Sequence, residues 1–427
     1  MQAESVNYKT ATHFGNVTIV HIGAMVLAMA TYAVLLCLAG AAALRIDPEV
    51  KMNTIEVIER WGYKAETVTV TTKDGYLLDM HHILGGRNES ADTVATGKPV
   101  VLMMHGLEDS SFTWVADLPE QSAGFIFADA GFDVWLGNVR GNSYGRRHKS
   151  LNPLFRKFWE FSWDEMAEID LPAQVNTILE RTGQKKLTYI GHSQGTLIMF
   201  AKLAEDQEFA SKIDKFFALA PITSISQVKG LIPLSVPSVH LTVSTFSTLL
   251  GHHEFFPPKL FLRMAANLLC TRNPGNVLCS NFVFLLVGPN SNQMNRTRLP
   301  VYLSHAPAGT SSQNILHWTQ MFVFGKMQKF RFPNMFENLK RYGTFNPPSY
   351  DISNIKTETH LYYGDQDWLA SSHDVKKNIL GNLDPAVVKH KLLKDFNHID
   401  FVWGMRAPEE IYRPIIETMR GGNGTTV

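Results

Sequence analysis

The feature that most constrains this fold is a regular alternation of strand-like and helix-like segments. Short apolar runs such as residues 100–105 (VVLMMH) indicate strands that are buried on both faces. The predicted strands are residues 100–105, 133–139, 187–191, 215–220, 359–364 and 389–393, and the predicted helices are residues 118–130, 162–181, 196–204, 373–380 and 409–419. This order predicts an α/β fold with a mainly parallel central sheet and helices on both faces.

Two local patterns add detail to this sheet. Residues 65–72 and 76–84 flank the turn signal Lys73-Asp74-Gly75 and predict an antiparallel hairpin before the parallel strands. Ser162 and Glu165 have the S-x-x-E spacing of a capping box, so we expect Ser162 to begin the helix over residues 162–181.

The alternation stops at Pro221. Residues 221–348 are rich in Leu, Phe, Pro and Asn without a clear strand pattern, which predicts a mostly helical cap inserted into the sheet domain. The predicted organisation is an N-terminal segment (1–44), a first part of the α/β core (45–221), a cap and lid insertion (222–350) and a second part of the core (351–427). Within the insertion, residues 230–258 mix apolar residues with Ser and Thr, which indicates a lid or an ordinary core-packing helix.

The N-terminal segment contains residues 22–44, an uncharged apolar stretch long enough to span a bilayer. It ends in small residues that resemble a signal-peptidase site. A cleaved signal peptide, an uncleaved membrane anchor and a buried core helix are the three interpretations. A start at Met25 instead of Met1 would give a signal peptide of ordinary length. The first two interpretations place the rest of the chain in a lumenal or extracellular compartment.

The modifiable residues agree with such a compartment, and the charge argues against two classes of partner. The formal net charge is +1, so there is no electrostatic footprint for nucleic acid or for an anionic membrane. Asn88, Asn295 and Asn423 each begin an N-glycosylation tripeptide. If Cys37 leaves with a signal peptide, Cys270 and Cys279 remain as an even pair, which favours a disulfide over two free thiols. Without a histidine cluster these two cysteines do not make a zinc site, and no metal is expected.

The motif that carries the chemistry is Gly191-His192-Ser193-Gln194-Gly195, a G-x-S-x-G pattern between a predicted strand and a predicted helix. A nucleophilic serine must project from a sharp, strained turn above the sheet. Side chains at the two glycine positions would collide with the neighbouring strand or helix. The alternative is a plain glycine-rich turn. The surrounding strand and helix favour a nucleophile elbow in which Ser193 is the nucleophile.

A serine hydroxyl needs a base and an orienting carboxylate, and in this type of fold they follow in the order Ser, Asp or Glu, His. His398 lies just past the last predicted strand, whereas its rival His390 lies within that strand. The penultimate strand ends with two candidate acids, Asp365 and Asp367. A tetrahedral intermediate also needs backbone N–H donors. We expect these from Gln194 and from Leu107, which follows Gly106 after the first apolar strand.

These residues and their order resemble those of the acid lipase family of α/β-hydrolases, which includes lysosomal and gastric lipases. The resemblance extends from about residue 48 to about residue 416. It includes the stretches MMHGLEDSSFTW, GTSSQNILHWTQ, YIGHSQGT, YYGDQDWLA and FNHIDFVWG. It implies an α/β-hydrolase core with a cap and a mobile lid over an apolar acyl site.

The resemblance also assigns roles to individual residues. It implies Ser193 as nucleophile, Asp367 as acid because D-W-L-A fits the family's D-x-L-A, and His398 as base. It implies Leu107 and Gln194 as oxyanion donors, and Cys270 paired with Cys279. The family's third cysteine falls near Val287 and is absent, and the family often has Asp where this chain has Ser371.

The expected function is hydrolysis of long-chain fatty acid esters, either triacylglycerols or steryl esters, through a Ser-Asp-His triad and an acyl-enzyme. The alternatives are a lipid-binding or storage protein on a lipase scaffold and a hydrolase of another acyl bond, such as a thioesterase. No cofactor is expected. The expected partner is a lipid ester at a lipid–water interface, and no protein partner is evident. The expected location is extracellular or lysosomal, with a membrane anchor as a minor possibility.

Overall fold

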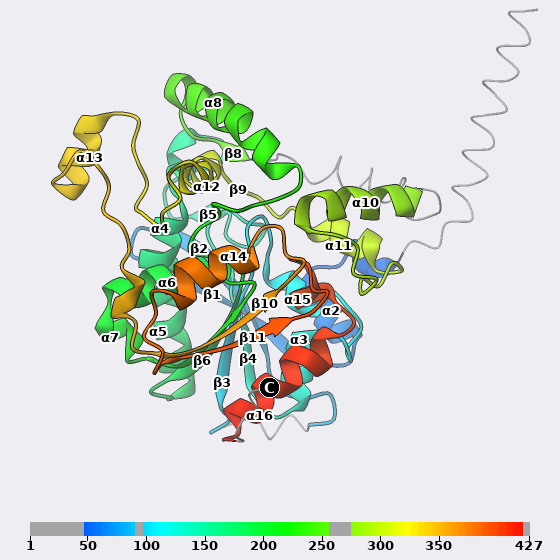
Figure 1. Ribbon diagram of the computed structural model, residues 1–427. Helices are drawn as coiled ribbons and strands as arrows, with labels where there is room; N and C mark the ends of the chain where they lie inside the picture. The colour runs from blue at the N-terminus through cyan, green and yellow to red at the C-terminus, as the bar shows by residue number, and fades with distance from the viewer. Residues whose placement is uncertain (1–46, 90–96, 256–274, 422–427) are drawn as a thin grey trace, which may run out of the picture. The chain divides into compact units, whose positions relative to one another are not determined.

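The computed structural model of the chain describes residues 47–89, 97–255 and 275–421 (Figure 1). Nine strands form the main sheet in the order β1-β2-β4-β3-β6-β7-β10-β11, with β5 paired to β2. The strands are β1 Ala65–Thr71, β2 Tyr76–Ile83, β3 Val100–Met104, β4 Asp133–Leu136, β5 Arg147–His148, β6 Leu187–His192, β7 Ile213–Leu219, β10 Glu358–Gly364 and β11 Val388–Leu393. From β4 to β11 all neighbouring strands are parallel, and the hairpin of β1 and β2 is antiparallel. The predicted fold class is confirmed.

The burial of each strand follows its position in the sheet. Every residue of β3 and β6 is buried, because these strands lie in the middle of the sheet with helices on both faces. The edge strand β1 alternates between exposed and buried residues along its second half. The other edge strand, β11, carries Lys389 and Lys391, and lysines on an edge strand discourage pairing with another chain.

The helices between the strands differ in detail from the sequence prediction. The predicted helix over residues 118–130 is shorter, since α3 spans Ala123–Asp129 and residues 118–122 form turns. Ser162 and Glu165 do form a capping box, and the helix that they begin consists of α4 Trp163–Glu165, a π-helical turn Met166–Asp170 and α5 Leu171–Thr182. The remaining helices of the core are α2 Thr54–Arg60, α6 Gln194–Glu205, α7 Gln207–Ala210, α14 Ser372–Asp374, α15 Asp400–Trp403 and α16 Arg413–Met419.

The segment between β7 and β10 is mostly helical. It contains α8 Ile232–Leu250, α10 Gly275–Val287, α11 Leu299–His305, α12 Ser312–Phe324 and α13 Met335–Tyr342. It also contains two short strands, because β8 Glu254–Phe255 pairs with β9 Thr310–Ser311. Two residues per strand are too few to show a period of two in the sequence. The predicted lid range 230–258 contains α8 and β8, and its last three residues lie outside the described part.

The described residues contain no helix that is both long and apolar enough to cross a membrane. The apolar stretch over residues 22–44 lies outside the described part of the chain. Its interpretation as a signal peptide or an anchor therefore stays a prediction, as do the domain boundaries drawn from the sequence.

Candidate active site

The candidate nucleophile lies where β6 ends and α6 begins. Ser193 has φ +52°, in the region that L-residues other than Asn and Asp rarely adopt. Its backbone N–H donates to the carbonyl oxygen of Leu219 at the end of β7, at 3.0 Å. A Cβ atom at Gly195 would lie 2.5 Å from the carbonyl oxygen of Met104, and one at Gly191 would lie 2.8 Å from the carbonyl carbon of Gly195. The two glycines thus let β3, β6 and α6 approach closely enough to hold this strained turn.

Three side chains from distant parts of the chain meet at this turn. The Nε2 atom of His398 lies 2.8 Å from Oγ of Ser193. On the other side of the ring, Nδ1 lies 2.9 Å and 3.1 Å from the two carboxylate oxygens of Asp367. All three residues are buried. If Nδ1 carries its proton toward Asp367, Nε2 is free to accept the proton of Ser193.

The two acids left open by the sequence have different surroundings. Asp367 follows β10, and its Oδ1 accepts the backbone N–H groups of Leu369 and Ala370, each at 2.8 Å. Asp365 instead accepts the backbone N–H of Asp395 at 2.7 Å. The rival base His390 lies in β11, where its Nδ1 is 3.5 Å from the hydroxyl of Tyr363. Of the two candidate acids and two candidate bases, Asp367 and His398 are therefore the pair that bond to each other, and His398 also bonds to Ser193.

The structure accounts for one departure from the acid lipase pattern. Ser371 is the N-cap of α14, and its Oγ accepts the backbone N–H of Asp374 at 3.1 Å. Serine and aspartate are about equally good N-cap residues. A serine at this position therefore caps α14 about as well as an aspartate would.

The predicted oxyanion donors lie beside the serine. The backbone of Gly106 is so close that an added Cβ would be 3.2 Å from Cβ of Ser193. Gln194 is the first residue of α6, where helical N–H groups have no partner within the helix. Among the described residues, neither the N–H of Leu107 nor that of Gln194 donates to another group. These amides and the positive end of the α6 dipole can stabilise negative charge at the site.

Two buried histidines support this arrangement, and their roles were not predicted from the sequence. His105 Nδ1 donates to the carbonyl oxygen of Gly106 at 2.8 Å, while its Nε2 accepts from Nδ2 of Asn142 at 3.1 Å. His192 Nε2 donates to the carbonyl oxygen of His398 at 2.9 Å. Burial lowers the pKa of His105 to about 4 and that of His192 to about 3. Both rings therefore stay neutral and fix the loops before Leu107 and around His398.

The remaining predicted residues are not part of this cluster. Cys279 lies in α10, whereas Cys270 lies outside the described residues, so their disulfide stays a prediction. Asn88 is exposed, Asn295 is half-buried and Asn423 lies outside the described part. In the described ranges, no group of three His, Cys, Asp or Glu side chains is placed to hold a metal ion.

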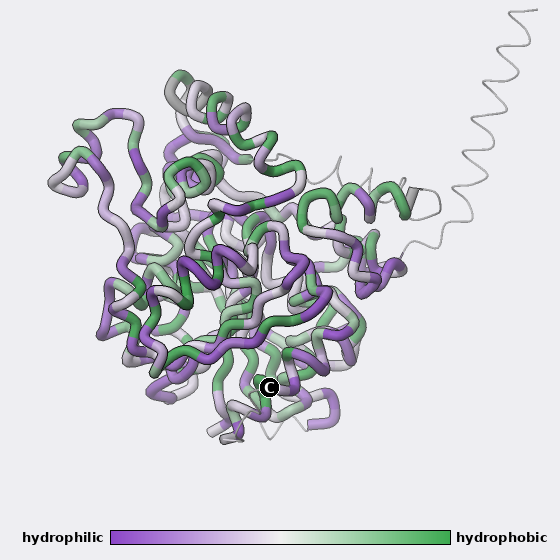
Figure 2. Tube along the Cα trace, viewed as in Figure 1, coloured by the Kyte–Doolittle hydropathy of each residue, from purple (hydrophilic) through white to green (hydrophobic). Residues whose placement is uncertain are grey.

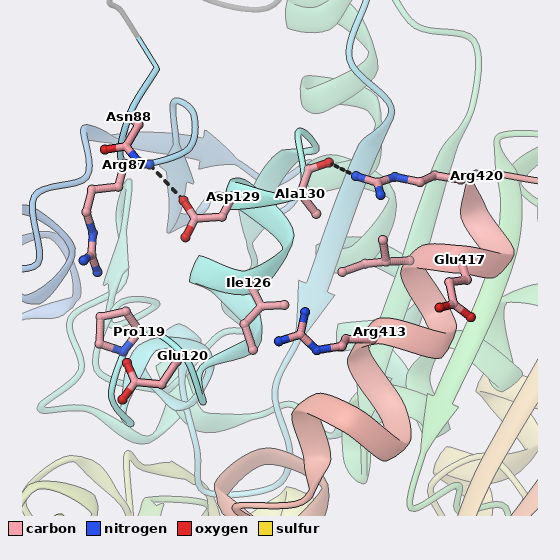
Figure 3. A pocket seen from close by; sticks show the side chains of 11 residues that line it. Arg87, Asn88, Pro119, Glu120, Ile126, Asp129, Ala130, Arg413, Glu417 and Arg420 are labelled. Carbon is pink, nitrogen blue, oxygen red and sulfur yellow. Dashed lines mark hydrogen bonds between the residues drawn. The ribbon is translucent and has the colours of Figure 1, made fainter.

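A surface pocket of about 630 Å³ lies away from the cluster (Figure 3). Its lining comes from α3, α16 and neighbouring loops and includes Arg87, Arg413 and Arg420 together with Asp129, Glu120 and Glu417. These charges balance, and several are already paired. Arg420 donates to the carbonyl oxygen of Ala130 at 2.5 Å, and Asp129 accepts the N–H of Arg87 at 2.9 Å. The pocket contains none of the predicted site residues.

The sequence matches two known families. Residues 54–118 match a family described as a partial α/β-hydrolase lipase region. Residues 99–404, more than half of the chain, match the family described as the α/β-hydrolase fold.

Curated relatives match along most of their length. The lipase lipl-5 of Caenorhabditis elegans is 50% identical over 376 residues, which cover 87% of this chain and 93% of the relative. Human lysosomal acid lipase/cholesteryl ester hydrolase is 42% identical, covering 88% of this chain and 92% of that protein. Human gastric triacylglycerol lipase is 41% identical, covering 87% and 91%.

A solved structure resembles the fold at much lower identity. The protein lip1 of Acinetobacter baumannii AYE has a TM-score of 0.50 and 14% identity, covering 89% of this chain and 99% of that chain. At that identity the likeness concerns the fold alone.

Proposed function

The chain belongs to the acid lipase family of α/β-hydrolases and is a carboxylic ester hydrolase, and we propose that it is a serine lipase acting through Ser193, His398 and Asp367. The observation that carries the proposal is the unbroken line of hydrogen bonds from Asp367 through His398 to Ser193. Its three members follow β6, β10 and β11, the parallel strands whose carboxyl ends share one edge of the sheet.

The proposed reaction has two halves. His398 Nε2 removes the Ser193 proton as Oγ attacks the ester carbonyl carbon, and the amides of Leu107 and Gln194 stabilise the resulting oxyanion. The proton then passes from His398 to the leaving alcohol, which leaves an acyl-serine. Water attacks this acyl-enzyme with His398 again as base, which releases the fatty acid and restores Ser193. Asp367 stabilises the charged imidazole in both halves.

The proposed substrate is a long-chain fatty acid ester, either a triacylglycerol or a steryl ester, at a lipid–water interface. Two similar proteins are named for these substrates, a gastric triacylglycerol lipase and a lysosomal cholesteryl ester hydrolase. The segment between β7 and β10 also exposes large apolar side chains, including Leu234, Leu241 and Leu249 of α8, Leu278 and Phe282 of α10, and Phe336 of α13. Figure 2 shows the hydrophobic character of α10 and of much of α8. Exposed apolar side chains of this size favour contact with a lipid surface.

We also propose an extracellular or lysosomal location. The relatives include proteins named as lysosomal and gastric, and residues 22–44 have the pattern of a signal peptide or anchor. N-terminal sequencing of the mature protein would distinguish cleavage near residue 43 from an intact anchor.

The function is tested by hydrolysis of a long-chain triacylglycerol emulsion and of a cholesteryl ester from about pH 4 to 8, with wild type beside Ser193→Ala. We expect the substitution to lower the rate by about 10⁶-fold, because no other group supplies the nucleophile. Ser211→Ala is the matched control, because Ser211 lies between α7 and β7 and its hydroxyl donates to the carbonyl oxygen of Glu208, which is not part of the site.

Circular dichroism should show that Ser193→Ala retains the fold. A folded Ser193→Ala protein with full activity would contradict the assignment of the nucleophile. A folded wild type that hydrolyses a thioester but neither lipid ester would contradict the proposed substrate.

A further inference from the structure

The side chain of Gln194 is held by a helix outside the α/β core. Its Oε1 accepts Nδ2 of Asn314 at 2.9 Å and Nε1 of Trp318 at 2.8 Å. Both donors lie on α12, which belongs to the segment between β7 and β10. An amide oxygen has two lone pairs, so these two bonds satisfy it completely.

All three side chains in this contact are buried. Because the contact is buried, loss of one donor removes a hydrogen bond from an amide oxygen that bulk solvent does not reach. The other end of the amide is held only weakly, since Nε2 donates to the sulfur of Met166 at 3.5 Å. The position of the Gln194 side chain is therefore determined mainly by Asn314 and Trp318.

Helix α12 is itself firmly attached to the core. Ser311, its N-cap residue, donates from Oγ to the carbonyl oxygen of Phe161 at 2.5 Å. Further along the helix, Nδ1 of His317 lies 3.0 Å from Oγ of Ser162 in the core, while its Nε2 donates at 2.8 Å to the carbonyl oxygen of Gln328, in the same segment as α12. A helix attached at these points can serve as a fixed support for a side chain that bonds to it.

The backbone of Gln194 lies directly after the strained Ser193 and begins α6. We propose that Asn314 and Trp318 are positioning residues of the oxyanion hole. They hold the Gln194 side chain and so fix the direction of its backbone N–H toward the oxyanion. The inference rests on the proposed function, in which that N–H is an oxyanion donor. An oxyanion contact forms fully only in the tetrahedral state, so the effect belongs to kcat and not to KM.

The test uses a soluble substrate, p-nitrophenyl butyrate, so that binding to a lipid surface plays no part. Trp318→Phe removes one donor and keeps an aromatic ring, and Asn314→Leu removes the other at similar volume. We expect kcat to fall at least about tenfold in each variant, with KM within about twofold of wild type. We expect the inhibition constant of an alkyl boronic acid, which forms a tetrahedral adduct with serine, to rise by a similar factor.

The matched control is Gln320→Leu on the same helix. Gln320 is also a buried amide, but it exchanges both its hydrogen bonds with the backbone of Arg331 and does not contact Gln194. This variant should lose stability and keep the wild-type kcat. Thermal unfolding of all three variants separates loss of folded protein from loss of rate.

A double-mutant cycle identifies the route of the effect. If Asn314 acts through Gln194, then Asn314→Leu should change kcat by less than about twofold in a Gln194→Met background. An unchanged kcat in folded Asn314→Leu and Trp318→Phe would overturn the inference, and so would an equal loss in the Gln194→Met background. Failure of the proposed function gives a different result, because Ser193→Ala would then still hydrolyse esters.

Discussion

At the scale of single residues, the site depends on how His398 is held. Asp367 bonds Nδ1 of the ring, and the loop N–H groups of Leu369 and Ala370 orient the carboxylate in turn. His192 fixes the backbone of His398 from the other side. The ring therefore presents Nε2 to Ser193 in one orientation.

We predict that Asp367→Asn lowers kcat by about 10³- to 10⁴-fold, because an amide at this position favours the wrong tautomer of His398. The measurement is hydrolysis of p-nitrophenyl butyrate by folded protein. Asp365→Asn is the control, because Asp365 bonds the backbone of Asp395 and not the histidine. A larger loss in Asp365→Asn than in Asp367→Asn would show that the acid has been misassigned.

A second residue-scale prediction concerns Asp400, two residues after His398. Burial raises the pKa of this carboxyl from 3.8 to about 7, although it accepts the N–H of Asn397 and the hydroxyl of Ser291. Between about pH 4 and 7, the folded protein therefore keeps a proton on Asp400 that the unfolded chain has released. The stability that Asp400 contributes is fully present below about pH 4 and is lost as the pH rises through 7.

Urea unfolding of wild type and Asp400→Asn at pH 5 and pH 8 measures this effect. We expect the free energy of unfolding of wild type, relative to the variant, to be higher at pH 5 than at pH 8. Equal differences at the two pH values would show that Asp400 does not change its protonation on folding.

At the scale of elements, the turn between β6 and α6 requires glycine, a residue without a side chain, on both sides of Ser193. The carbonyl oxygens of Met104 and His105 occupy the space where a Cβ of residue 195 would lie. Both are backbone atoms of the β3 end that leads to Leu107. The same close approach that packs α6 on the sheet therefore also brings together the amides of Leu107 and Gln194, the proposed oxyanion donors.

We predict that Gly195→Ala destabilises the protein by about 1–3 kcal/mol or more, since backbone atoms cannot move aside as a flexible side chain can. Activity should fall further than stability, because the displacement separates β3 from α6. The comparison is Gly183→Ala, where nothing lies within 4 Å of the added Cβ and only the φ of +67° opposes the change. If Gly195→Ala unfolds at the same temperature as wild type and keeps its activity, this account of the elbow is incorrect.

At the scale of the whole molecule, one buried ion pair joins segments far apart in sequence. Glu49 near the start of the described chain binds Arg298, which precedes α11. Arg298 also donates twice to the carbonyl oxygen of Ala116, at 3.0 Å and 2.7 Å. Both side chains are almost completely buried, and Glu49 also pairs with the more exposed Arg60, at 3.2 Å.

We predict that Glu49→Ala costs about 3–5 kcal/mol of stability, because it removes a buried carboxylate that binds both Arg298 and Arg60. Chemical denaturation measures the cost. Glu409→Ala breaks an exposed pair with Arg413 and should cost at most about 1 kcal/mol. Similar costs for the two substitutions would mean that Arg298 finds compensation elsewhere.

The sequence by itself determined the features that depend on short stretches of chain. The order of strands and helices, the hairpin, the Ser162 capping box and the strained turn at Ser193 each follow from the sterics and hydrogen bonding of neighbouring residues. His398 could be predicted for a related reason, since the end of a parallel strand lies at the same edge of the sheet as the serine.

The tertiary structure decided what depends on contacts between distant segments. The residues alone left Asp365 and Asp367 open, and only the fold shows which one reaches His398. Nothing local indicated β8 and β9, the neutral supports His105 and His192, or the contact of Gln194 with Asn314 across 120 residues. The partner of such a polar group is set by how the whole chain packs, and its local sequence carries no signal of that partner.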